Sequence, residues 1–332
     1  MSLTPDRFVR ENFSDIEEAT AFFQATLPAA VVNILDMKSL TTEQGTFIDE
    51  SMQEYRTDLL FSVKTKQDWP LQLYLLFEHK SYQDKRIFVQ LLSYMARIYE
   101  KQATPAPVLL FVFYHGEKEW RLGTSFKDYL KLKPEDYELF SRYLPDFKFE
   151  LFDVKLTDVE RLEVTLNTAM FLQIIQAAEQ ATLEDRLEVI FYKAEDFFRE
   201  EKLLEKLRKL FLFVYAISGL SAEQVSQKLS KISQRLGDEA MTTAQKLHQE
   251  GLQQGIEQGI EQGIEKGLEK GRIEMARDLL LQQWQWKFKN IAIAEKTAIQ
   301  NCTDVTRLRE AITMILADRP KSEIIEMLSK EV

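Results

Sequence analysis

The stretch LQLYLLFEHKSYQDKR, residues 71–86, decides the fold because a largely apolar run turns abruptly polar within it. Such a run is typical of a strand inside a sheet, and Glu78, His79 and Lys80 stand at its end. Side chains on a strand alternate between its two faces, so Glu78 and Lys80 are expected to point one way and His79 the other. This polar end of a buried strand is the natural place to look for a site.

The flanking segments predict an α/β core. Four strands are expected, over residues 55–63, the stretch quoted above, 106–117 and 147–156. The first two form a hairpin whose polar turn centres near Gln67. Apolar residues then recur at helical spacing from Lys85 to about Gln102, and Asp84 is suited to cap that helix.

Helical patterns precede and follow this core. Residues 14–35 indicate a helical segment interrupted at Pro28, with Ser14 and Glu17 in a capping-box arrangement at its start. Residues 157–236 have a helical pattern throughout.

Composition sets limits on the class of protein. A chain of 332 residues suggests about two domains, and Cys302 is its single cysteine, so no disulfide can form within it. The net charge of -10 argues against a surface coated by nucleic acid, although a local basic cleft is compatible with it. Apolar runs of signal-peptide or membrane-spanning length are missing. We therefore expect a cytoplasmic protein without membrane contact.

The hairpin predicts a metal site. Asp58 lies near the start of the first strand and Glu78 ends the second, so both carboxylates are expected at the same end of the hairpin. Antiparallel neighbours lie ~5 Å apart, near enough for two carboxylates to share a cation. Mg²⁺ prefers such oxygen ligands. Lys80 is placed to orient or deprotonate a water molecule, or to stabilise charge developing on a phosphate.

The following helix adds polar groups to this end. Gln90 and Tyr94 are four residues apart and share one helix face, from which either can reach the water, Lys80 or a phosphate. Lys85 and Arg86 lie in its first turn, where the helix N-terminus also favours anions. Phosphate contact and ordinary solvated charges remain equal alternatives for these two cations.

This set of residues resembles the PD-(D/E)xK nuclease superfamily: Asp58, then Glu78-x-Lys80, then Gln90-x-x-x-Tyr94 on a helix. More narrowly, the chain resembles the Rpn family of recombination-promoting nucleases, the transposase-like Transposase_31 proteins. RTDLLFSV, LYLLFEHKS, the strand ending in FYHG and the late GIEQGIEQG repeat carry the likeness, which extends over roughly residues 4–275.

The resemblance implies a restriction-endonuclease-like core that cuts DNA. Asp58, Glu78 and the backbone carbonyl of His79 would bind Mg²⁺, with Mn²⁺ as an alternative ion. Lys80 would be the catalytic lysine and Gln90 an auxiliary catalytic residue. The acidic residue that such nucleases often carry on the first helix is not identified, because three candidates compete: Glu11, Glu17 and Glu18.

Plainer interpretations stand beside these. The D…ExK pattern alone also fits a polar strand end with an internal Lys–Glu pair. Glu17 is better suited to capping than to metal binding, His79 to packing, and His115 to a turn than to a ligand set.

A glycine at every fourth position marks residues 251–271, GLQQGIEQGIEQGIEKGLEKG. Each glycine costs a helix about 0.5–1 kcal/mol relative to alanine, so close helix–helix approach is the natural compensation. We expect this segment to self-associate, with a solvated helical spacer as the alternative. The expected organisation is a nuclease-like core over 1–156, a helical extension over 157–245, the glycine segment within 246–275 and a small helical tail over 276–332.

The sequence therefore predicts a Mg²⁺-dependent endodeoxyribonuclease that hydrolyses phosphodiester bonds and promotes recombination by making breaks. A catalytically silent DNA-binding or oligomerising module of the same fold is the second hypothesis, and the acidic balance of the chain favours it slightly.

Overall fold

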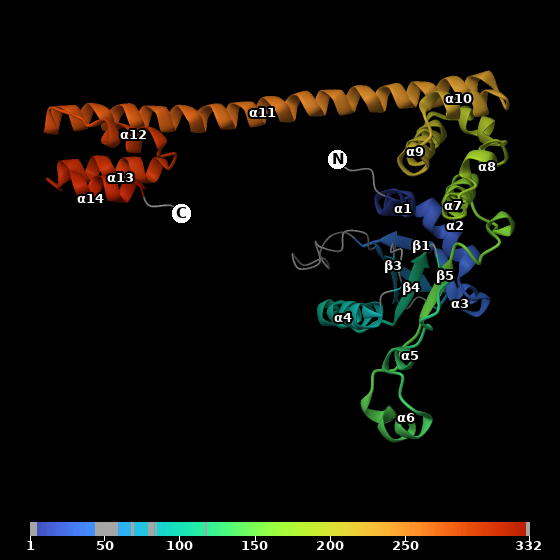
Figure 1. Ribbon diagram of the computed structural model, residues 1–332. Coiled ribbons are helices and arrows are strands. Elements are labelled where there is room, and N and C mark those ends of the chain that lie inside the picture. Colours follow the sequence, from blue (N-terminus) through green and yellow to red (C-terminus); the bar gives the residue numbers. More distant parts are fainter. Residues whose placement is uncertain are drawn as a thin grey trace. The chain divides into compact units, whose positions relative to one another are not determined.

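A five-stranded mixed sheet lies at the centre of residues 1–247, the first of two units in this computed structural model; the second comprises residues 248–332 (Figure 1). The strands follow one another in space as in the chain: β1 (Leu35–Thr42), β2 (Leu59–Thr65), β3 (Pro70–Glu78), β4 (Val108–Tyr114) and β5 (Phe149–Asp153). β1, β2 and β3 pair in antiparallel fashion, whereas β3, β4 and β5 are parallel.

The structure describes residues 5–43, 59–67, 70–78, 83, 85–116 and 118–329. Within β3, Pro70 and residues 72–78 are described by their backbone alone.

The first unit contains the helices α1 (Pro5–Ser14), α2 (Ile16–Thr26), α3 (Ala29–Ile34), α4 (Arg86–Lys101), α5 (Phe126–Leu130), α6 (Pro134–Phe140), α7 (Leu166–Glu179), α8 (Leu183–Ile190), α9 (Glu201–Ser218) and α10 (Ala222–Ser230). Within the described residues of this unit, the short 3₁₀ helices are η2 (Ser141–Tyr143), η3 (Val159–Arg161) and η4 (Ala194–Arg199). The remaining helices are α11 (Gln234–Phe288), α12 (Ile293–Asn301), α13 (Val305–Leu316) and α14 (Lys321–Ser329).

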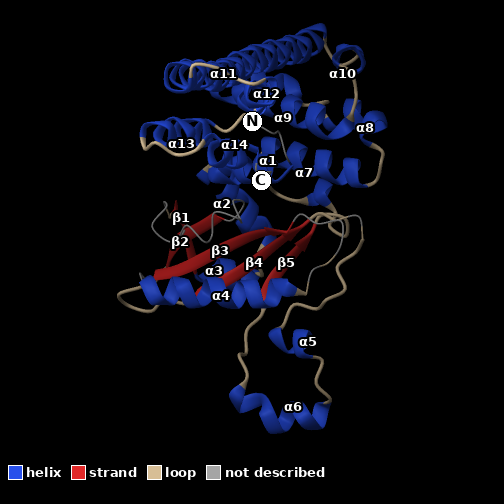
Figure 2. Cartoon of the chain, turned by 60° about the vertical axis from the view of Figure 1, so that its left-hand side comes forward, coloured by secondary structure: helices blue, strands red, loops and turns tan. Residues whose placement is uncertain are grey.

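Two hydrophobic clusters cover the two faces of the sheet. α4 packs its apolar face on one side, where Leu110 and Val112 of β4 point. The other face, with Phe111 and Phe113, packs against α1, α2 and α7 (Figure 2). Because β4 is buried on both faces, its sequence is a nearly continuous apolar run.

The second unit has a core of its own. The C-terminal part of α11 contributes Leu280 and Trp284, which are fully buried against residues of α12, α13 and α14. Lys321 lies over the rings of Trp284 and Phe288, at 5.7 Å and 5.1 Å from their centroids. Among the described residues, no helix is long and apolar enough to cross a membrane.

The predicted mixture of strands and helices is confirmed, and the four expected strands correspond to β2, β3, β4 and β5. The prediction for residues 14–35 is partly wrong. A helix break near Pro28 is present between α2 and α3, but Leu35 begins strand β1, and α1 precedes the expected start. β1 was missed because a register shift between Asp36 and Thr41 interrupts its pairing with β2 and hides the alternation of its apolar residues.

The capping box at Ser14 and Glu17 is also wrong. Asp15 is the N-cap of α2, and its carboxylate accepts a hydrogen bond from the Glu17 backbone N–H at 3.0 Å. Ser14 ends α1 instead, and its hydroxyl donates to the Arg10 carbonyl oxygen at 2.7 Å. Asp15 is the cap because it directly precedes Ile16, so its carboxylate reaches the first free N–H groups of α2.

Candidate functional site

The carboxyl end of the sheet gathers the ends of several strands. Glu78 is the last residue of β3 and lies in register with Tyr114, the last residue of β4. Tyr114 in turn pairs with Asp153, the last residue of β5. Leu59, which begins β2, lies opposite Leu75 of β3, so the hairpin opens toward this same end. In sheets with parallel strands, the carboxyl ends are the usual location of ligand sites.

Four predicted site residues belong to this end by their place in the chain. Asp58 immediately precedes β2, and His79 and Lys80 immediately follow β3; all three lie outside the described residues. Glu78 is described by its backbone alone. The predicted metal ligands and the catalytic lysine therefore stay predictions, whereas the pairing of β2 with β3 that was expected to bring them together is present.

Helix α4 starts at the carboxyl end, because it connects β3 to the parallel strand β4 and must run back along the sheet. Lys85 and Arg86 stand at its start and are exposed. Lys85 occupies the position before the helix, and its side chain makes no capping hydrogen bond. The expected cap, Asp84, lies outside the described residues. Two exposed cations beside a helix N-terminus are suited to anions.

Gln90 and Tyr94 share a face of α4, as the sequence predicts. The Gln90 side-chain amide donates to the Tyr94 hydroxyl at 3.2 Å. Tyr94 is 3% exposed and packs in the cluster beneath α4, whereas Gln90 is only partly buried. The phosphate contact predicted for Tyr94 stays a prediction. In the structure its hydroxyl holds the amide of Gln90 in place.

Two further side chains, which the sequence analysis did not single out, tie the loops at this end together. Gln83, just before α4, donates to the Glu119 carbonyl oxygen and accepts from the Arg121 backbone N–H at 2.8 Å. The carboxylate of Asp153 is 5% exposed and accepts from the backbone N–H groups of Trp120, at 3.1 Å, and Lys155, at 3.0 Å. These contacts fix the chain after β4 against the segment that leads into α4.

His115 follows β4 directly and is buried, with 3% of its surface exposed. Its Nδ1 lies 3.7 Å from Glu179 Oε1 of α7. This contact lies on the α7 side of the sheet, where Phe113 also packs. His115 therefore serves packing between the sheet and α7.

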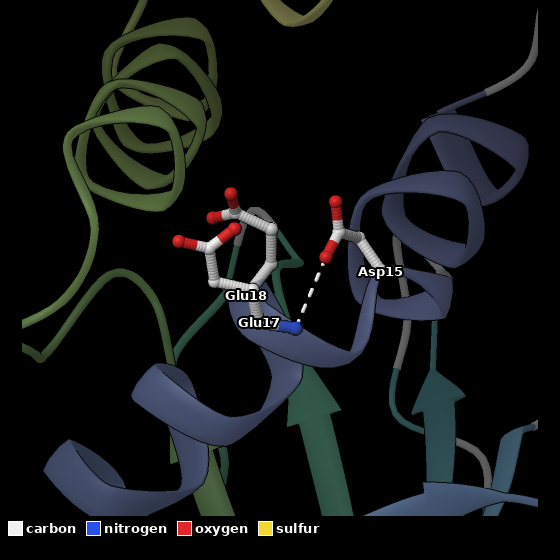
Figure 3. Close-up of side chains that lie close together, drawn as sticks. All are labelled: Asp15, Glu17 and Glu18. Carbon is white, nitrogen blue, oxygen red and sulfur yellow. Dashed lines mark hydrogen bonds between the residues drawn. The ribbon is translucent and has the colours of Figure 1, made fainter. Parts of the chain in front are cut away.

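A second acidic group stands at the junction of α1 and α2 (Figure 3). We call it the helix-junction cluster: Asp15, Glu17 and Glu18, whose carboxylate oxygens lie within 4.8 Å of one another. By this geometry the three carboxylates could hold a metal ion. However, the Lys206 ammonium group of α9 already lies 2.5 Å from Glu18, 3.0 Å from Asp15 and 3.7 Å from Glu17.

Buried hydrogen bonds complete the environment of Glu18, which is 1% exposed. Its carboxylate accepts from the Thr168 hydroxyl at 2.6 Å and from the Thr165 hydroxyl, both on or next to α7. A buried carboxylate needs such partners, because an unpaired charge is strongly disfavoured away from water. Glu18 thus connects α2, α7 and α9.

Asp15 and Lys206 favour each other's ionised forms. Burial alone would raise the pKa of Asp15, but the hydrogen bond and charge of Lys206 outweigh it and hold that pKa below its usual value. Burial likewise works to lower the pKa of Lys206, and the hydrogen bonds to Glu18 and Asp15 outweigh it, so that the pKa is raised. An added metal ion would compete with Lys206 for these oxygens.

A small cavity of about 50 Å³ adjoins this cluster and is lined by Asn12, Asn167 and Lys209 among others. The Asn167 amide donates to Asn12 Oδ1 at 2.8 Å across it. From its sequence, Glu18 was only one of three competing acidic residues. Its partners Lys206 and Thr168 come from distant parts of the chain, so no local sequence pattern could identify them.

Comparison with known proteins relates the chain to one family. The model of the Transposase_31 family, described as “Putative transposase, YhgA-like”, matches residues 4–210. The chain is 26% identical over 244 residues to “Recombination-promoting nuclease RpnA” of Escherichia coli (strain K12), a match that covers 71% of this chain and 80% of that protein. No solved structure matches the chain.

Two further relatives come from the same bacterium. Identity to “Recombination-promoting nuclease RpnC” is 31% over 122 residues, which covers 35% of this chain and 40% of the relative. Identity to “Inactive recombination-promoting nuclease-like protein RpnE” is 26% over 248 residues, which covers 71% of this chain and 78% of the relative. The family thus includes proteins named as nucleases and proteins named as inactive.

Proposed function

The chain belongs to the Transposase_31, YhgA-like family, and from that premise we propose that it is a metal-dependent endonuclease that hydrolyses phosphodiester bonds in DNA. Relatives named recombination-promoting nucleases support this proposal, and a role in recombination would follow from the breaks that such an enzyme makes.

The observation that carries the proposal is the open end of the β2–β3 hairpin. Asp58 adjoins the described start of β2, while Glu78 ends β3 and Lys80 follows two residues later. The register of β2 with β3 directs both strand ends to the carboxyl end of the sheet. Helix α4, with Lys85 and Arg86 at its N-terminus, begins at the same end. The order and pairing of the strands thus bring acidic and basic residues and a helix N-terminus to the carboxyl end of the sheet.

The donor set fits Mg²⁺ or Mn²⁺. Two carboxylates, of Asp58 and Glu78, and the His79 backbone carbonyl are hard oxygen donors of the kind these ions prefer. When bound, such an ion supplies positive charge that polarises the scissile phosphate. We assign the PD-(D/E)xK arrangement to these residues as part of the proposal.

The remaining residues have separate roles in the proposal. Lys80 orients or deprotonates the water molecule that attacks phosphorus, and it stabilises the charge that develops as the phosphorus–oxygen bond breaks. Gln90, held by the Tyr94 hydroxyl, positions that water or a phosphate oxygen. Lys85 and Arg86 bind neighbouring phosphates of the DNA backbone, and DNA is the macromolecular partner.

Cleavage of supercoiled plasmid tests the proposal. The native chain, Lys80→Ala and Asp58→Ala are purified identically and incubated with Mg²⁺, Mn²⁺ or EDTA. We expect metal-dependent nicking by the native chain and a loss of about 100-fold or more in both variants. Native protein that leaves the DNA intact, or variants that cut as well as the native chain, would contradict the proposal.

The relative named inactive supports a second candidate, a DNA-binding or oligomerising module without catalysis. RpnE is 26% identical to this chain over 248 residues, and the nuclease RpnA is 26% identical over 244 residues, so overall similarity does not separate the two functions. Metal binding separates them. A ligand that binds only the folded state raises the unfolding temperature, so Mg²⁺ or Mn²⁺ stabilises the native chain if it is an enzyme. Asp58→Ala is the matched control and should show no such rise.

A further inference from the structure

Helix α11 carries an apolar stripe on its surface that no described residue of the second unit covers. The segment 251–271, here called the glycine ladder, has four parallel rows of side chains because its sequence repeats every four residues. One row is glycine, the next is leucine and isoleucine, the third is mainly glutamate, and the fourth is glutamine followed by lysine. Every residue of the ladder is exposed.

The apolar row consists of five large side chains, each between 48% and 60% exposed: Leu252, Ile256, Ile260, Ile264 and Leu268. Each four-residue step turns the row by 400°, so the stripe winds round the helix by ~40° per repeat, and Leu252 and Leu268 are ~160° apart. Apolar residues continue beyond the ladder on the side that Leu268 occupies. Met275, Leu279 and Trp286 follow Leu268 by about 700°, 1100° and 1800° of helical rotation, so all four lie within ~20° of one line. These three are 74%, 44% and 74% exposed.

A different side of this part of the helix is buried within the second unit. Ala276, Leu280 and Trp284 are buried in the core of the second unit. The exposed stripe therefore is not a misplaced core face. It is a second apolar face of α11, and contiguous apolar surface of this kind marks an interaction site.

No described contact within the chain requires glycine at the six ladder positions. A Cβ atom built on any of the six would meet no described atom within 4 Å, apart from the nearby backbone of its own helix, and none of the six has a positive φ. Glycine weakens a helix and leaves its backbone open to close approach. A row of glycines beside a row of isoleucines is a groove beside a ridge, and both repeat at the same four-residue spacing.

We propose that the apolar stripe and glycine ladder of α11 bind the same surface of a second copy of this chain, with the two helices parallel and in register. The partner is a copy of the chain because the surface is complementary to itself. Packing of four-residue ridges into four-residue grooves joins the two helices, and a repeat longer than about 3.6 residues winds them with a right-handed twist.

Symmetry selects the parallel orientation. In a parallel pair related by a two-fold axis along the helices, the isoleucine ridge of each copy faces the glycine groove of the other. In an antiparallel pair, the two-fold axis crosses the helices and brings like rows together, ridge against ridge and groove against groove. Only the parallel pair fills both grooves.

The charged rows favour the same orientation. The glutamate row flanks the ridge and the glutamine–lysine row flanks the groove, so a parallel pair brings Glu265 and Glu269 of one copy to the same side as Lys266 and Lys270 of the other. An antiparallel pair would bring the glutamate rows of both copies to one side. Exposed charges of this kind contribute more to the choice of orientation than to affinity.

The first experiment measures association of the full chain by sedimentation equilibrium. Ile260→Ser with Ile264→Ser should raise the dimer dissociation constant by about 100-fold or more, because two central ridge residues are lost. The control, Gln258→Ser with Gln262→Ser, changes the same turns in the row that flanks the groove but enters neither groove, so it should raise that constant far less than the isoleucine changes do. Both isoleucines are exposed in the single chain, so circular dichroism should show that each variant stays folded. A monomeric native chain, or an isoleucine variant that associates unchanged, would overturn the proposal.

The second experiment tests orientation by disulfide formation between copies. Leu252→Cys and Leu268→Cys are prepared separately in a Cys302→Ser chain and oxidised under mild conditions. A parallel pair in register links each variant to itself. If the variants instead fail to link alone and link only when the two are mixed, the helices are antiparallel and the proposed orientation is wrong.

Discussion

Glycines in two parts of helix α11 have different surroundings. Near the start of α11, a Cβ on Gly237 would clash with Ser230 Oγ and lie 2.8 Å from the Ser226 carbonyl oxygen, so glycine is needed for packing against α10. In the ladder, a Cβ on Gly259 or Gly263 would meet no described atom within 4 Å beyond its own helix backbone. Packing within one chain explains the first glycine and leaves the others unexplained.

The contrast extends to polar groups. In the first unit, the buried carboxylate of Glu18 has Lys206, Thr165 and Thr168 as partners from distant parts of the sequence. Ladder side chains are all exposed, and the hydrogen bond from the Gln253 amide to Glu257 at 2.8 Å is a local one. The fold of one chain therefore explains the polar contacts of Glu18, whereas the proposed pairing of two copies is what would explain the sequence of the ladder.

The largest effect is expected from Lys206→Met. This change leaves Glu18 buried among the hydroxyl groups of Thr165 and Thr168 without its cation, which should lower the free energy of unfolding by about 3–5 kcal/mol. Urea unfolding followed by circular dichroism measures it. Lys202→Met is the matched control, because Lys202 is 66% exposed and lies 3.6 Å from Glu17. Equal effects of the two changes would show that Glu18 does not depend on Lys206.

Gly237→Ala should have the next largest effect. The added methyl group forces Ser230 and the backbone at Ser226 to move, and overpacking of this kind costs about 1–3 kcal/mol. The same urea unfolding measurement detects the loss. A variant as stable as the native chain would mean that α10 yields easily, and Gly237 would then resemble the ladder glycines.

A smaller, pH-dependent effect is expected from Asp15→Asn, which keeps an N-cap and removes only the charge. Because the folded pKa of Asp15 is lowered, its charge stabilises the fold above its unfolded pKa of about 3.9, and this contribution is lost as pH falls through the lower folded value. The native chain should therefore melt above the variant at pH 6, by an amount equivalent to at most about 1 kcal/mol. This difference should shrink as pH falls through the lowered folded pKa, and a constant difference in thermal melting over acidic pH would rule out the charge as its source.

The smallest effect, with the opposite sign, is expected from Gly259→Ala. In dilute protein, alanine should stabilise the helix by about 0.5–1 kcal/mol, because no described neighbour stands in its way. At high concentration the same methyl group should weaken association, if the helices approach closely there. Thermal melting by circular dichroism at two concentrations tests both statements. Destabilisation in dilute protein would reveal a contact within the chain and remove the contrast with Gly237.

Local sequence patterns predicted those parts of the fold that have regular periodicity. β4 is a continuous apolar run, α4 has a clean apolar face, and both were predicted near their observed positions. β1 was missed because its register shift breaks the alternation, and the α2 cap was misplaced because Ser14 and Asp15 are both good capping residues by type.

Of the site, only the features that depend on residues close together in the sequence could be predicted. The hairpin geometry and the Gln90–Tyr94 pair could be predicted, since both rest on neighbours at fixed spacing. The burial of Tyr94 could not, because it depends on the sheet beneath α4. Likewise the cation beside Glu18 comes from α9, nearly two hundred residues away, and only the folded chain brings it there.

The central claim is that the strand end, rather than the helix-junction cluster, holds the metal that supports cleavage. The most direct test compares plasmid nicking by Glu78→Gln and Glu17→Gln across a titration of Mg²⁺. The side chain of Glu17 is 63% exposed, so its replacement leaves the fold intact. The account predicts that Glu78→Gln abolishes nicking at every Mg²⁺ concentration while Glu17→Gln cuts like the native chain. Nicking lost in Glu17→Gln and kept in Glu78→Gln would contradict it and move the metal to the junction of α1 and α2.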